Sequence, residues 1–402
     1  MKVAIIGGGA AGFFSAINVK ENFPNAEVTI FEKSTKVLSK VKISGGGRCN
    51  VTNAETSIKE LASAYPRGGK QLKKAFAIFS TKDTFNWFES RDVPLVTQPD
   101  NCVFPKSQNS QSIIDCFMEE VKRLNIQIKY KTAVENILEI DNTLKLTFSD
   151  KTVTHFDKVI VATGGSPRRK GLIWLENLDH KIEDPVPSLF TFNMPNENVV
   201  DLMGTVVEKT QTSIQGTKIK SNGPLLITHW GMSGPAILKL SSLGARLLNE
   251  MNYNFKIQVN WVNGLNNELV MDELVDIANN HSNKYLSSIR PFQLSSRFWN
   301  YLLTKVNLPL DKKWGETGKK GFNKVVNILT NDLYTVEGKT TFKEEFVTCG
   351  GISLESINFK TMQSSTVKNL YFAGEILDID GITGGYNFQA AWTTAFIAAK
   401  LK

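Results

Sequence analysis

The 402-residue sequence predicts an α/β, Rossmann-like fold of the two-dinucleotide-binding class, with an inserted β-barrel-like domain and a small helical domain. Three observations predict it. An apolar strand at the start of the chain runs into a glycine-rich turn and a helix, a similar unit ends the chain, and a third strand with a glycine turn stands between them. One dinucleotide-binding domain is therefore expected to draw on both ends of the chain.

The first unit is the apolar run Val3–Ile6, followed by the turn G-G-G-A-A-G and a helical pattern. In G-x-G-x-x-G, Gly7 allows a tight turn, Gly9 lets a pyrophosphate approach the backbone, and Gly12 lets helix and strand pack closely. The phosphates then lie at the helix N-terminus, where free N–H groups and the helix dipole favour negative charge. The residues expected to contact the nucleotide here are Gly7, Gly9, Ala10, Ala11 and Gly12.

A second strand, from Glu27 to Phe31, is followed by Glu32 and Lys33. Glu32 lies about 20 residues past the last glycine of the turn, where an acidic group is expected to bind the ribose hydroxyls of the adenosine. Lys33 is expected at the same site. Val134, in an extended segment further along the chain, is a candidate neighbour of the adenine.

The C-terminal unit decides between FAD and NAD, which the first motif cannot separate. An apolar strand, 369–373, is followed by a glycine-rich loop and a helix through Ala399. A carboxylate in this loop can bind ribityl hydroxyls, and the positive end of the helix would stabilise the anionic reduced flavin ring. The alternative is an ordinary strand–helix unit whose glycines only turn the chain. The candidate FAD ligands are Gly374, Glu375, Gly385, Tyr386, Asn387 and Phe388. Asn387 is expected to cap the helix near the flavin ring.

The third strand, Lys158–Val161, ends in A-T-G-G. In two-dinucleotide folds such a turn returns the chain to the FAD domain. Thr163 and Gly164 are therefore added to the expected cofactor ligands.

Composition narrows the class of protein. The hydrophobic share of 41% and the charged share of 21% are ordinary for a globular protein, and no run of about 18 apolar residues predicts a membrane span. No secretory signal precedes the first strand, so a cytoplasmic location is expected. The four cysteines are scattered, which predicts no disulfide framework and no metal site.

The net charge of +8 is concentrated in one segment. Residues 33–74 hold ten basic and two acidic residues, so the rest of the chain is balanced. A second basic cluster, 168–170, follows the third glycine turn. Such segments attract polyanions such as RNA, although solvated lysines that keep the protein soluble are the alternative.

Four segments carry a resemblance to a known family: I-S-G-G-G-R-C-N-V-T-N (43–53), T-H-W-G-M-S-G-P-A (228–236), T-C-G-G (348–351) and 371–387. Together they resemble the BaiN/YhiN-type, aminoacetone oxidase-like bacterial flavoproteins, which are FAD-dependent NAD(P)/FAD oxidoreductases. The resemblance implies an FAD domain split between the two chain ends, with a β-barrel-like and a helical domain inserted. We expect the boundaries 1–190 and 348–402 for the FAD domain, 191–265 and 331–347 for the barrel-like domain, and 266–330 for the helical domain.

The chain departs from this family in two places. Ser166–Trp174 replaces a glycine-rich stretch with the letters G-D-G-Y, which puts any contact from that loop in doubt. The letters N-C-V-F-P (101–105) replace G-R-V-F-P, so an arginine contact is lost.

The glycine loop 45–50 is expected to pack close to the flavin, because glycines permit a backbone approach that side chains would block. We therefore include Gly47, Arg48 and Cys49 among the cofactor ligands. Arg48 could pair with a phosphate or a substrate anion. Cys49, beside Arg48, is a candidate catalytic thiol with a lowered pKa or a proton-donor role; the alternative is a small buried residue.

His229 is the other candidate acid or base. It lies in a turn before Gly231 and not on an apolar strand face. The alternative is a hydrogen-bonded structural histidine.

The resemblance implies three substrate classes: a uridine of large-subunit ribosomal RNA reduced to dihydrouridine, small aminoketones, and steroid-like enones. The basic segment beside the expected flavin loop favours RNA. A small-molecule flavin oxidase or reductase is the alternative, and a third hypothesis is a flavin-containing RNA-binding assembly factor. No second G-x-G-x-x-G is present, so NADH or NADPH is expected to bind only transiently as electron donor.

Overall fold

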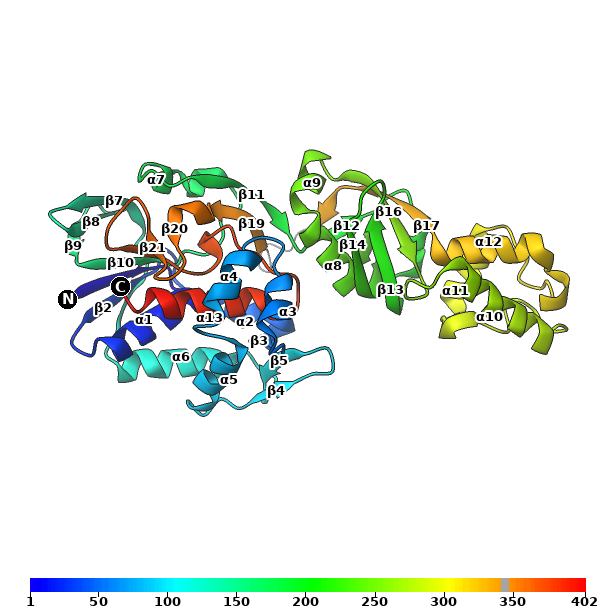
Figure 1. Cartoon of the computed structure of the whole chain (residues 1–402), viewed down its shortest axis with the longest axis horizontal. Helices are drawn as coiled ribbons and strands as arrows, with labels where there is room; N and C mark the ends of the chain where they lie inside the picture. The colour runs from blue at the N-terminus through cyan, green and yellow to red at the C-terminus, as the bar shows by residue number, and fades with distance from the viewer. Residues whose placement is uncertain (341–346) are drawn as a thin grey trace. The chain divides into compact units, whose positions relative to one another are not determined.

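The computed structural model describes residues 1–340 and 347–402, which form two compact units (Figure 1). Unit 1 combines residues 1–188 with 347–402, and unit 2 contains residues 189–340. Positions 341–346 of the expected barrel-like segment 331–347 lie outside the described residues. The expected domain boundaries themselves stay a prediction.

A seven-stranded sheet forms the centre of unit 1. Its order is β20 (Ile357–Asn358), β21 (Gln363–Ser364), β22 (Leu370–Phe372), β10 (Lys158–Val161), β1 (Lys2–Ile6), β2 (Glu27–Phe31) and β6 (Gln127–Lys129). The five strands from β22 to β6 run parallel. The central strands read as continuous apolar runs because both faces of a parallel sheet are covered. Strands from both ends of the chain thus share one sheet.

Two helices from opposite ends of the chain, α1 (Ala10–Asn22) and α13 (Tyr386–Ala398), pack against each other beside this sheet (Figure 1). An aromatic cluster joins them: the ring centroids of Phe14 and Trp392 are 5.3 Å apart, and those of Phe14 and Trp87 are 4.6 Å apart. The other helices of unit 1 are α2 (Ser39–Gly47), α3 (Ile58–Ser63), α4 (Gly69–Ala75), α5 (Thr81–Glu89), α6 (Gln111–Arg123) and α7 (Ile173–Glu176).

Three smaller antiparallel sheets complete unit 1. They are β3 (Thr52–Asn53), β5 (Cys102–Pro105) and β4 (Leu95–Thr97); β7 (Val134–Ile140), β8 (Thr143–Phe148) and β9 (Val153–Phe156); and β11 (Ile182–Ser188) with β19 (Val347–Ile352). The first of these sheets places the glycine loop beside the N-C-V-F-P segment, because Thr52 pairs with Val103.

A seven-stranded antiparallel sheet in unit 2 closes on itself. The two strands at the ends of its order, β17 (Asp332–Glu337) and β18 (Lys339–Thr340), are separated only by Gly338. One bent segment therefore pairs with β16 (Asn254–Asn260) at its start and with β12 (Thr191–Asn193) at its end. Gly338 permits the bend, since its φ of 95° disfavours other residues. The remaining strands are β13 (Val206–Ile214), β14 (Lys220–Thr228) and β15 (Gly231–Ser233).

The helices of unit 2 share one hydrophobic core with this barrel-like sheet. They are α8 (Pro235–Leu243), α9 (Ala245–Glu250), α10 (Asn267–Asn280), α11 (Ser296–Lys305) and α12 (Gly318–Thr330). A buried carboxylate ties α11 to the sheet: Asp332 accepts hydrogen bonds from Lys305 Nζ at 2.6 Å and from Trp261 Nε1 at 3.0 Å. Burial raises the pKa of Asp332 even with these donors present.

Candidate cofactor and active site

The three glycines of the first turn have different steric surroundings. A β-carbon at Gly7 would overlap Ala162 O, and one at Gly12 would overlap Gly7 O, so the packing of the chain itself requires glycine at both positions. Gly9 has an ordinary extended backbone (φ −95°), and a β-carbon there would meet no atom within 4 Å. The described chain therefore leaves open space above Gly9. This space fits the room that a pyrophosphate needs at the turn.

The first turn of α1 is free to bind an anion. Its N-cap is Gly9, no side chain caps it, and Ala10 and Ala11 begin the helix. Their N–H groups have no partner within the helix, which is the arrangement that phosphate groups use at helix N-termini. These residues therefore fit the FAD pyrophosphate.

Glu32 lies directly after β2 and beside the glycine turn. Its Oε2 accepts a hydrogen bond from Gly8 N at 2.9 Å, and its Oε1 accepts one from Ser34 N at 2.8 Å. The segment that leads to Val134 is held there too, because Thr132 N donates to Glu32 O at 2.9 Å. Lys33 is exposed. The structure thus holds Thr132, two residues before Val134, at Glu32, and the ribose contact of Glu32 and the adenine contact of Val134 stay predictions.

The loop after β22 reaches the same end of α1. A β-carbon at Gly374 would lie 2.8 Å from Ala11 Cβ, so the short helix η6 (Gly374–Ile376) touches the first turn of α1. Glu375 follows with its side chain only 20% exposed. A β-carbon at Gly164 would lie 4.0 Å from Glu375 Oε2, which places the turn after β10 beside this carboxylate, with Thr163 exposed. These expected ligands come from three distant parts of the chain.

The loop before α13 is tightly fixed. Gly385 is the N-cap of α13 with φ 88°, and a β-carbon there would overlap Thr52 O. Tyr65 Oη donates to Tyr386 O at 2.6 Å, and burial raises the pKa of the Tyr386 hydroxyl to about 12. The ring of Phe388 stacks on Trp392, with centroids 5.4 Å apart.

The expectation that Asn387 caps α13 is wrong. Asn387 is the second residue of the helix, and its amide folds back onto the preceding loop. Its Oδ1 accepts from Gly381 N at 2.8 Å and its Nδ2 donates to Gly381 O at 3.0 Å. Both ends of the amide are therefore used to close the loop, and the N-terminus of α13 has no side-chain cap.

Two glycines of the loop at the end of α2 border open space. β-Carbons at Gly46 and Gly47 would meet no atom within 4 Å, although both residues have positive φ. Arg48 is half-buried, and its guanidinium lies 4.2 Å from the centroid of the Phe104 ring. Its Nε donates to Gly45 O at 3.2 Å, so Arg48 closes its own loop.

Cys49 is fully buried in the core of unit 1, with φ 63°. Burial raises the pKa of its thiol to about 12, and a hydrogen bond with Ser44 offsets this only in part. The expectation of a lowered pKa is therefore wrong, because the cost of burying a thiolate exceeds the help from its neighbours. At neutral pH Cys49 is a protonated thiol, and its burial favours the alternative of a small packing residue.

Alkylation of the native protein tests this burial. Among the cysteines, Cys102 is partly exposed, whereas Cys49, Cys116 and Cys349 are buried. Iodoacetamide at pH 8 is expected to modify Cys102 alone in the native protein, since the thiolate is the reactive form. Mass spectrometry after peptide digestion would show this, with all four cysteines modified in urea as the control. Modification of Cys49 at the rate of Cys102 would contradict it.

His229 belongs to unit 2. It lies in the turn between β14 and β15, is exposed, and its ring meets Trp230 edge-on with centroids 4.3 Å apart. A side chain on an exposed turn is available to a substrate. Its part in the reaction stays a prediction.

One buried ion pair was missed by the sequence reasoning. Asp380 is fully buried, and both oxygens of its carboxylate accept hydrogen bonds from the guanidinium of Arg67. The distance from Arg67 Nε to Asp380 Oδ1 is 2.5 Å. The other oxygen, Oδ2, also accepts a hydrogen bond from Ser188 Oγ at 2.7 Å. The sequence showed Arg67 only as one of the basic residues in segment 33–74. Nothing in the sequence distinguishes Asp380 from the nearby Asp378 as its ion-pair partner. The pair holds the loop before α13.

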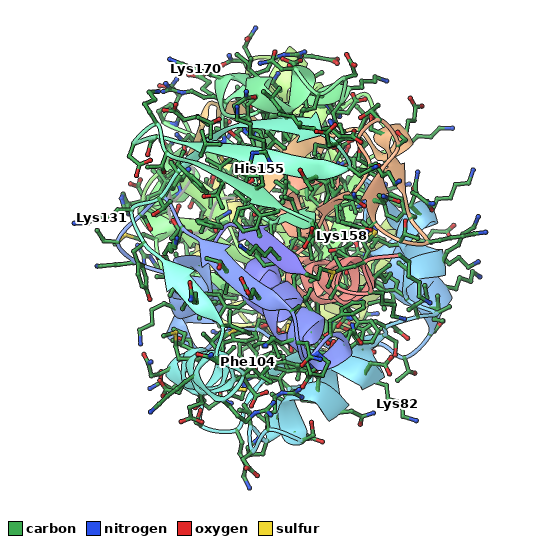
Figure 2. All side chains as sticks on the ribbon, turned by 90° about the vertical axis from the view of Figure 1, so that its left-hand side faces the viewer. Lys82, Phe104, Lys131, His155, Lys158 and Lys170 are labelled. Atoms are coloured by element: carbon green, nitrogen blue, oxygen red, sulfur yellow. The ribbon has the colours of Figure 1, made fainter. Side chains whose placement is uncertain are left out.

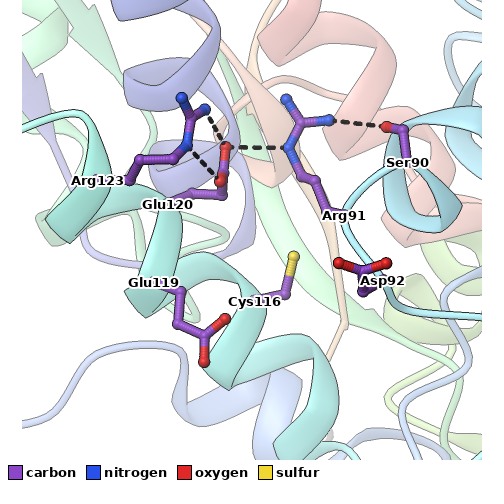
Figure 3. Close-up of a pocket in the computed structure, with 7 residues that line it drawn as sticks. All are labelled: Ser90, Arg91, Asp92, Cys116, Glu119, Glu120 and Arg123. Carbon is purple, nitrogen blue, oxygen red and sulfur yellow. Dashed lines mark hydrogen bonds and ion pairs between the residues drawn. The ribbon is translucent and has the colours of Figure 1, made fainter.

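A pocket of about 380 Å³ lies elsewhere in unit 1, between the end of α5 and α6 (Figure 3). Two of its arginines share one carboxylate: Glu120 accepts from Arg91 Nε at 3.1 Å and from Arg123 at 2.7 Å. It contains none of the expected site residues, so we do not assign it to the reaction. Its lining residues are Ser90, Arg91, Asp92, Cys116, Glu119, Glu120 and Arg123.

Within 1–340 and 347–402, no three or more His, Cys, Asp or Glu side chains gather in a way that could bind a metal ion. In the same residues, no helix has the length and apolar character needed to cross a membrane.

The chain is similar to several known proteins. The model of the family described as HI0933-like protein Rossmann domain matches residues 1–401. The chain is 27% identical to the ribosomal RNA dihydrouridine synthase of Haemophilus influenzae, across 98% of this chain and 96% of that protein. It is 24% identical to the 3-dehydro-bile acid delta(4,6)-reductase of Clostridium scindens, across 99% and 98%. The solved 3-ketosteroid delta1-dehydrogenase of Sterolibacterium denitrificans has the same fold, with a TM-score of 0.53 over 99% of this chain and 98% of that chain at 10% identity.

Proposed function

The chain belongs to the HI0933-like Rossmann-domain family and is an FAD-dependent oxidoreductase, and from this premise we propose that it reduces a uridine of large-subunit ribosomal RNA to dihydrouridine. The observation that carries the proposal is the similarity, across almost the whole of both chains, to a protein named ribosomal RNA dihydrouridine synthase. We place the enzyme in the cytoplasm, where ribosomal RNA is found.

The surface charge of unit 1 supports an RNA substrate. Of the ten basic residues in 33–74, the eight lysines are exposed, whereas Arg48 and Arg67 are partly buried. Three lysines outside this segment, Lys82, Lys131 and Lys170, are also exposed and lie near the edge of the molecule in Figure 2. Lys158 is partly buried and lies nearer the centre of that view. Exposed lysines supply the salt-dependent attraction for a phosphate backbone.

Each candidate site residue has a separate role in this proposal. Reduced FAD, when bound, would supply the hydride for reduction of the uracil C5=C6 double bond, and a proton from the protein would complete the reduction. Gly9 and the first turn of α1 hold the pyrophosphate, Glu32 the adenosine ribose, and Glu375 the ribityl chain. Arg48 holds a substrate phosphate.

The proton is the second requirement of the reaction. We propose His229 as the acid, because it is exposed and Cys49 is fully buried. NADH or NADPH binds transiently and restores the reduced cofactor, since the chain has one G-x-G-x-x-G motif.

Mass spectrometry of nucleosides from large-subunit ribosomal RNA tests the proposal. Cells without this gene are expected to lose one dihydrouridine, which the wild-type gene restores and a Gly9→Glu variant does not. Restoration by the Gly9→Glu variant would instead support the assembly-factor hypothesis, because that role does not need FAD. An unchanged nucleoside profile would overturn the RNA assignment.

A small-molecule reductase is the second candidate. The similarity to the bile-acid reductase of C. scindens, across 99% of this chain, favours an enone substrate. Reoxidation of the reduced cofactor by low-mass enones, seen as the return of its yellow absorbance, but not by RNA, would establish this function. Bleaching of the oxidised cofactor by aminoketones, which act as electron donors, would establish an oxidase.

A further inference from the structure

Charge is segregated among the helices of unit 2. Residues 284–324 contain nine basic and two acidic residues, whereas the preceding stretch, 265–283, contains four acidic residues and no lysine or arginine. The four acidic residues belong to α10, which packs against α12 (Figure 1). Within the described residues, the ion pairs of 284–324 are Lys305 with Asp332 and Lys313 with Glu316, so none joins α10 to α12.

The solvent face of α12 contains lysine and asparagine and no acidic residue. Its exposed side chains, which we call the lysine face, are Lys319, Lys320, Asn323, Lys324 and Asn327. The opposite face is apolar and packs into the core of unit 2 through Val325, Val326 and Leu329. Because this apolar face is already covered by protein, α12 lacks the free apolar surface with which a helix inserts into a lipid surface.

The charges of Lys319 and Lys320 do not stabilise the helix that carries them. Both lie in the first turn of α12, which contains no acidic residue, and the helix dipole disfavours cations there. In the described part of the chain, neither side chain has a hydrogen-bond or ion-pair partner. Lys324 differs, because its Nζ donates to Val306 O at 2.9 Å and so lies against the end of α11. The fold of unit 2 therefore gains nothing from two of the three positive charges.

We propose that the lysine face of α12 binds the sugar–phosphate backbone of the ribosomal RNA substrate. Exposed lysines attract phosphates through the release of counterions, and asparagine amides donate hydrogen bonds to phosphate and sugar oxygens. A protein partner fits this face less well, because protein interfaces are poor in lysine and rich in aromatic side chains, which the lysine face lacks. The inference rests on the proposed RNA substrate, and it gives unit 2 a part in binding that substrate.

Filter binding of large-subunit ribosomal RNA, purified from cells without this gene, tests the role of the lysine face in the holoenzyme. The triple variant Lys319→Gln, Lys320→Gln, Lys324→Gln is expected to raise the Kd about tenfold at about 150 mM salt. It is also expected to reduce the slope of log K against log salt concentration by about two to three, since each lysine–phosphate contact contributes slightly less than one. Glutamine keeps the helix propensity of lysine.

A matched control removes the same charge from another part of unit 2. It replaces three exposed lysines of the barrel-like sheet and its turns by glutamine, namely Lys218, Lys220 and Lys256. Its Kd for RNA is expected to stay within about twofold of wild type. Thermal melting and the FAD content of both triple variants are expected to match wild type, because none of the six side chains is buried.

Single turnovers of the reduced holoenzyme separate RNA binding from chemistry. For the α12 variant, the half-saturating RNA concentration is expected to rise about tenfold, and the limiting rate to stay within about twofold of wild type. An unchanged Kd for RNA, or equal losses in the two triple variants, would overturn the inference and leave the proposed function intact. A wild-type enzyme that neither binds nor reduces the RNA would overturn both. Loss of binding to anionic lipid vesicles alone would assign the lysine face to a membrane surface instead.

Discussion

Gly9→Glu is expected to abolish FAD binding and to leave the apoprotein folded. The open space above Gly9 accepts a side chain without overlap, and its φ of −95° suits any residue. A carboxylate in that space would occupy the place of the pyrophosphate and repel it. Like charges brought together at a binding site cost several kcal/mol, which corresponds to a Kd weakened by roughly a hundredfold or more. Absorbance of the purified protein near 450 nm measures bound flavin directly.

Two alanine variants provide the controls. Gly9→Ala is expected to fold normally and to keep most of its FAD, because a methyl group is small and uncharged. Gly12→Ala is expected to fold poorly, since its β-carbon would overlap Gly7 O. Stoichiometric yellow cofactor in Gly9→Glu, or poor folding of that variant, would contradict our assignment of Gly9.

Arg67→Ala is expected to destabilise unit 1 by about 3–5 kcal/mol, because it leaves the buried carboxylate of Asp380 without its cation. Urea unfolding of the apoprotein measures this free energy without a contribution from the cofactor.

A double variant that removes both charges of the ion pair is the control for that result. Arg67→Met with Asp380→Leu removes both charges and is expected to recover most of the lost stability. A single variant with wild-type stability would show that water reaches Asp380. Equal destabilisation by the single and double variants would assign the loss to packing and not to charge.

The fold class could be predicted from the sequence, and it is confirmed by the family match and by the strand order. Its signals are local: a strand, a glycine turn and a helix lie within about twenty residues, and the roles of Gly9 and Glu32 in binding FAD stay predictions from that motif. The closed barrel was predicted only in outline. The bend at Gly338 depends on which strands pair with each other, and the spacing of residues along the sequence does not show that pairing.

The site was predicted where it depends on a short motif and missed where it depends on distant partners. Asn387 bonds within its own loop, which a helix-cap pattern does not reveal. The raised pKa of Cys49 comes from burial by residues from the whole of unit 1. Arg67 and Asp380 are 313 positions apart, and Lys40 and Glu375 are 335 positions apart. Lys40 and Arg67 had both been counted in the basic segment 33–74, expected to attract RNA or to be solvated, because a single sequence does not identify ion-pair partners at such distances.

The position of β22 next to β10 has a consequence for synthesis of the chain. β10 ends at Val161, and the strand that covers its open edge begins only at Leu370. At about 5–20 residues per second, translation of the intervening segment takes on the order of 10–40 s. During that interval unit 2 can fold, while the nascent unit 1 has an unpaired strand edge, which is a site of aggregation. The segment from Leu370 to Ala398, made after unit 2, completes both this sheet and the candidate cofactor site.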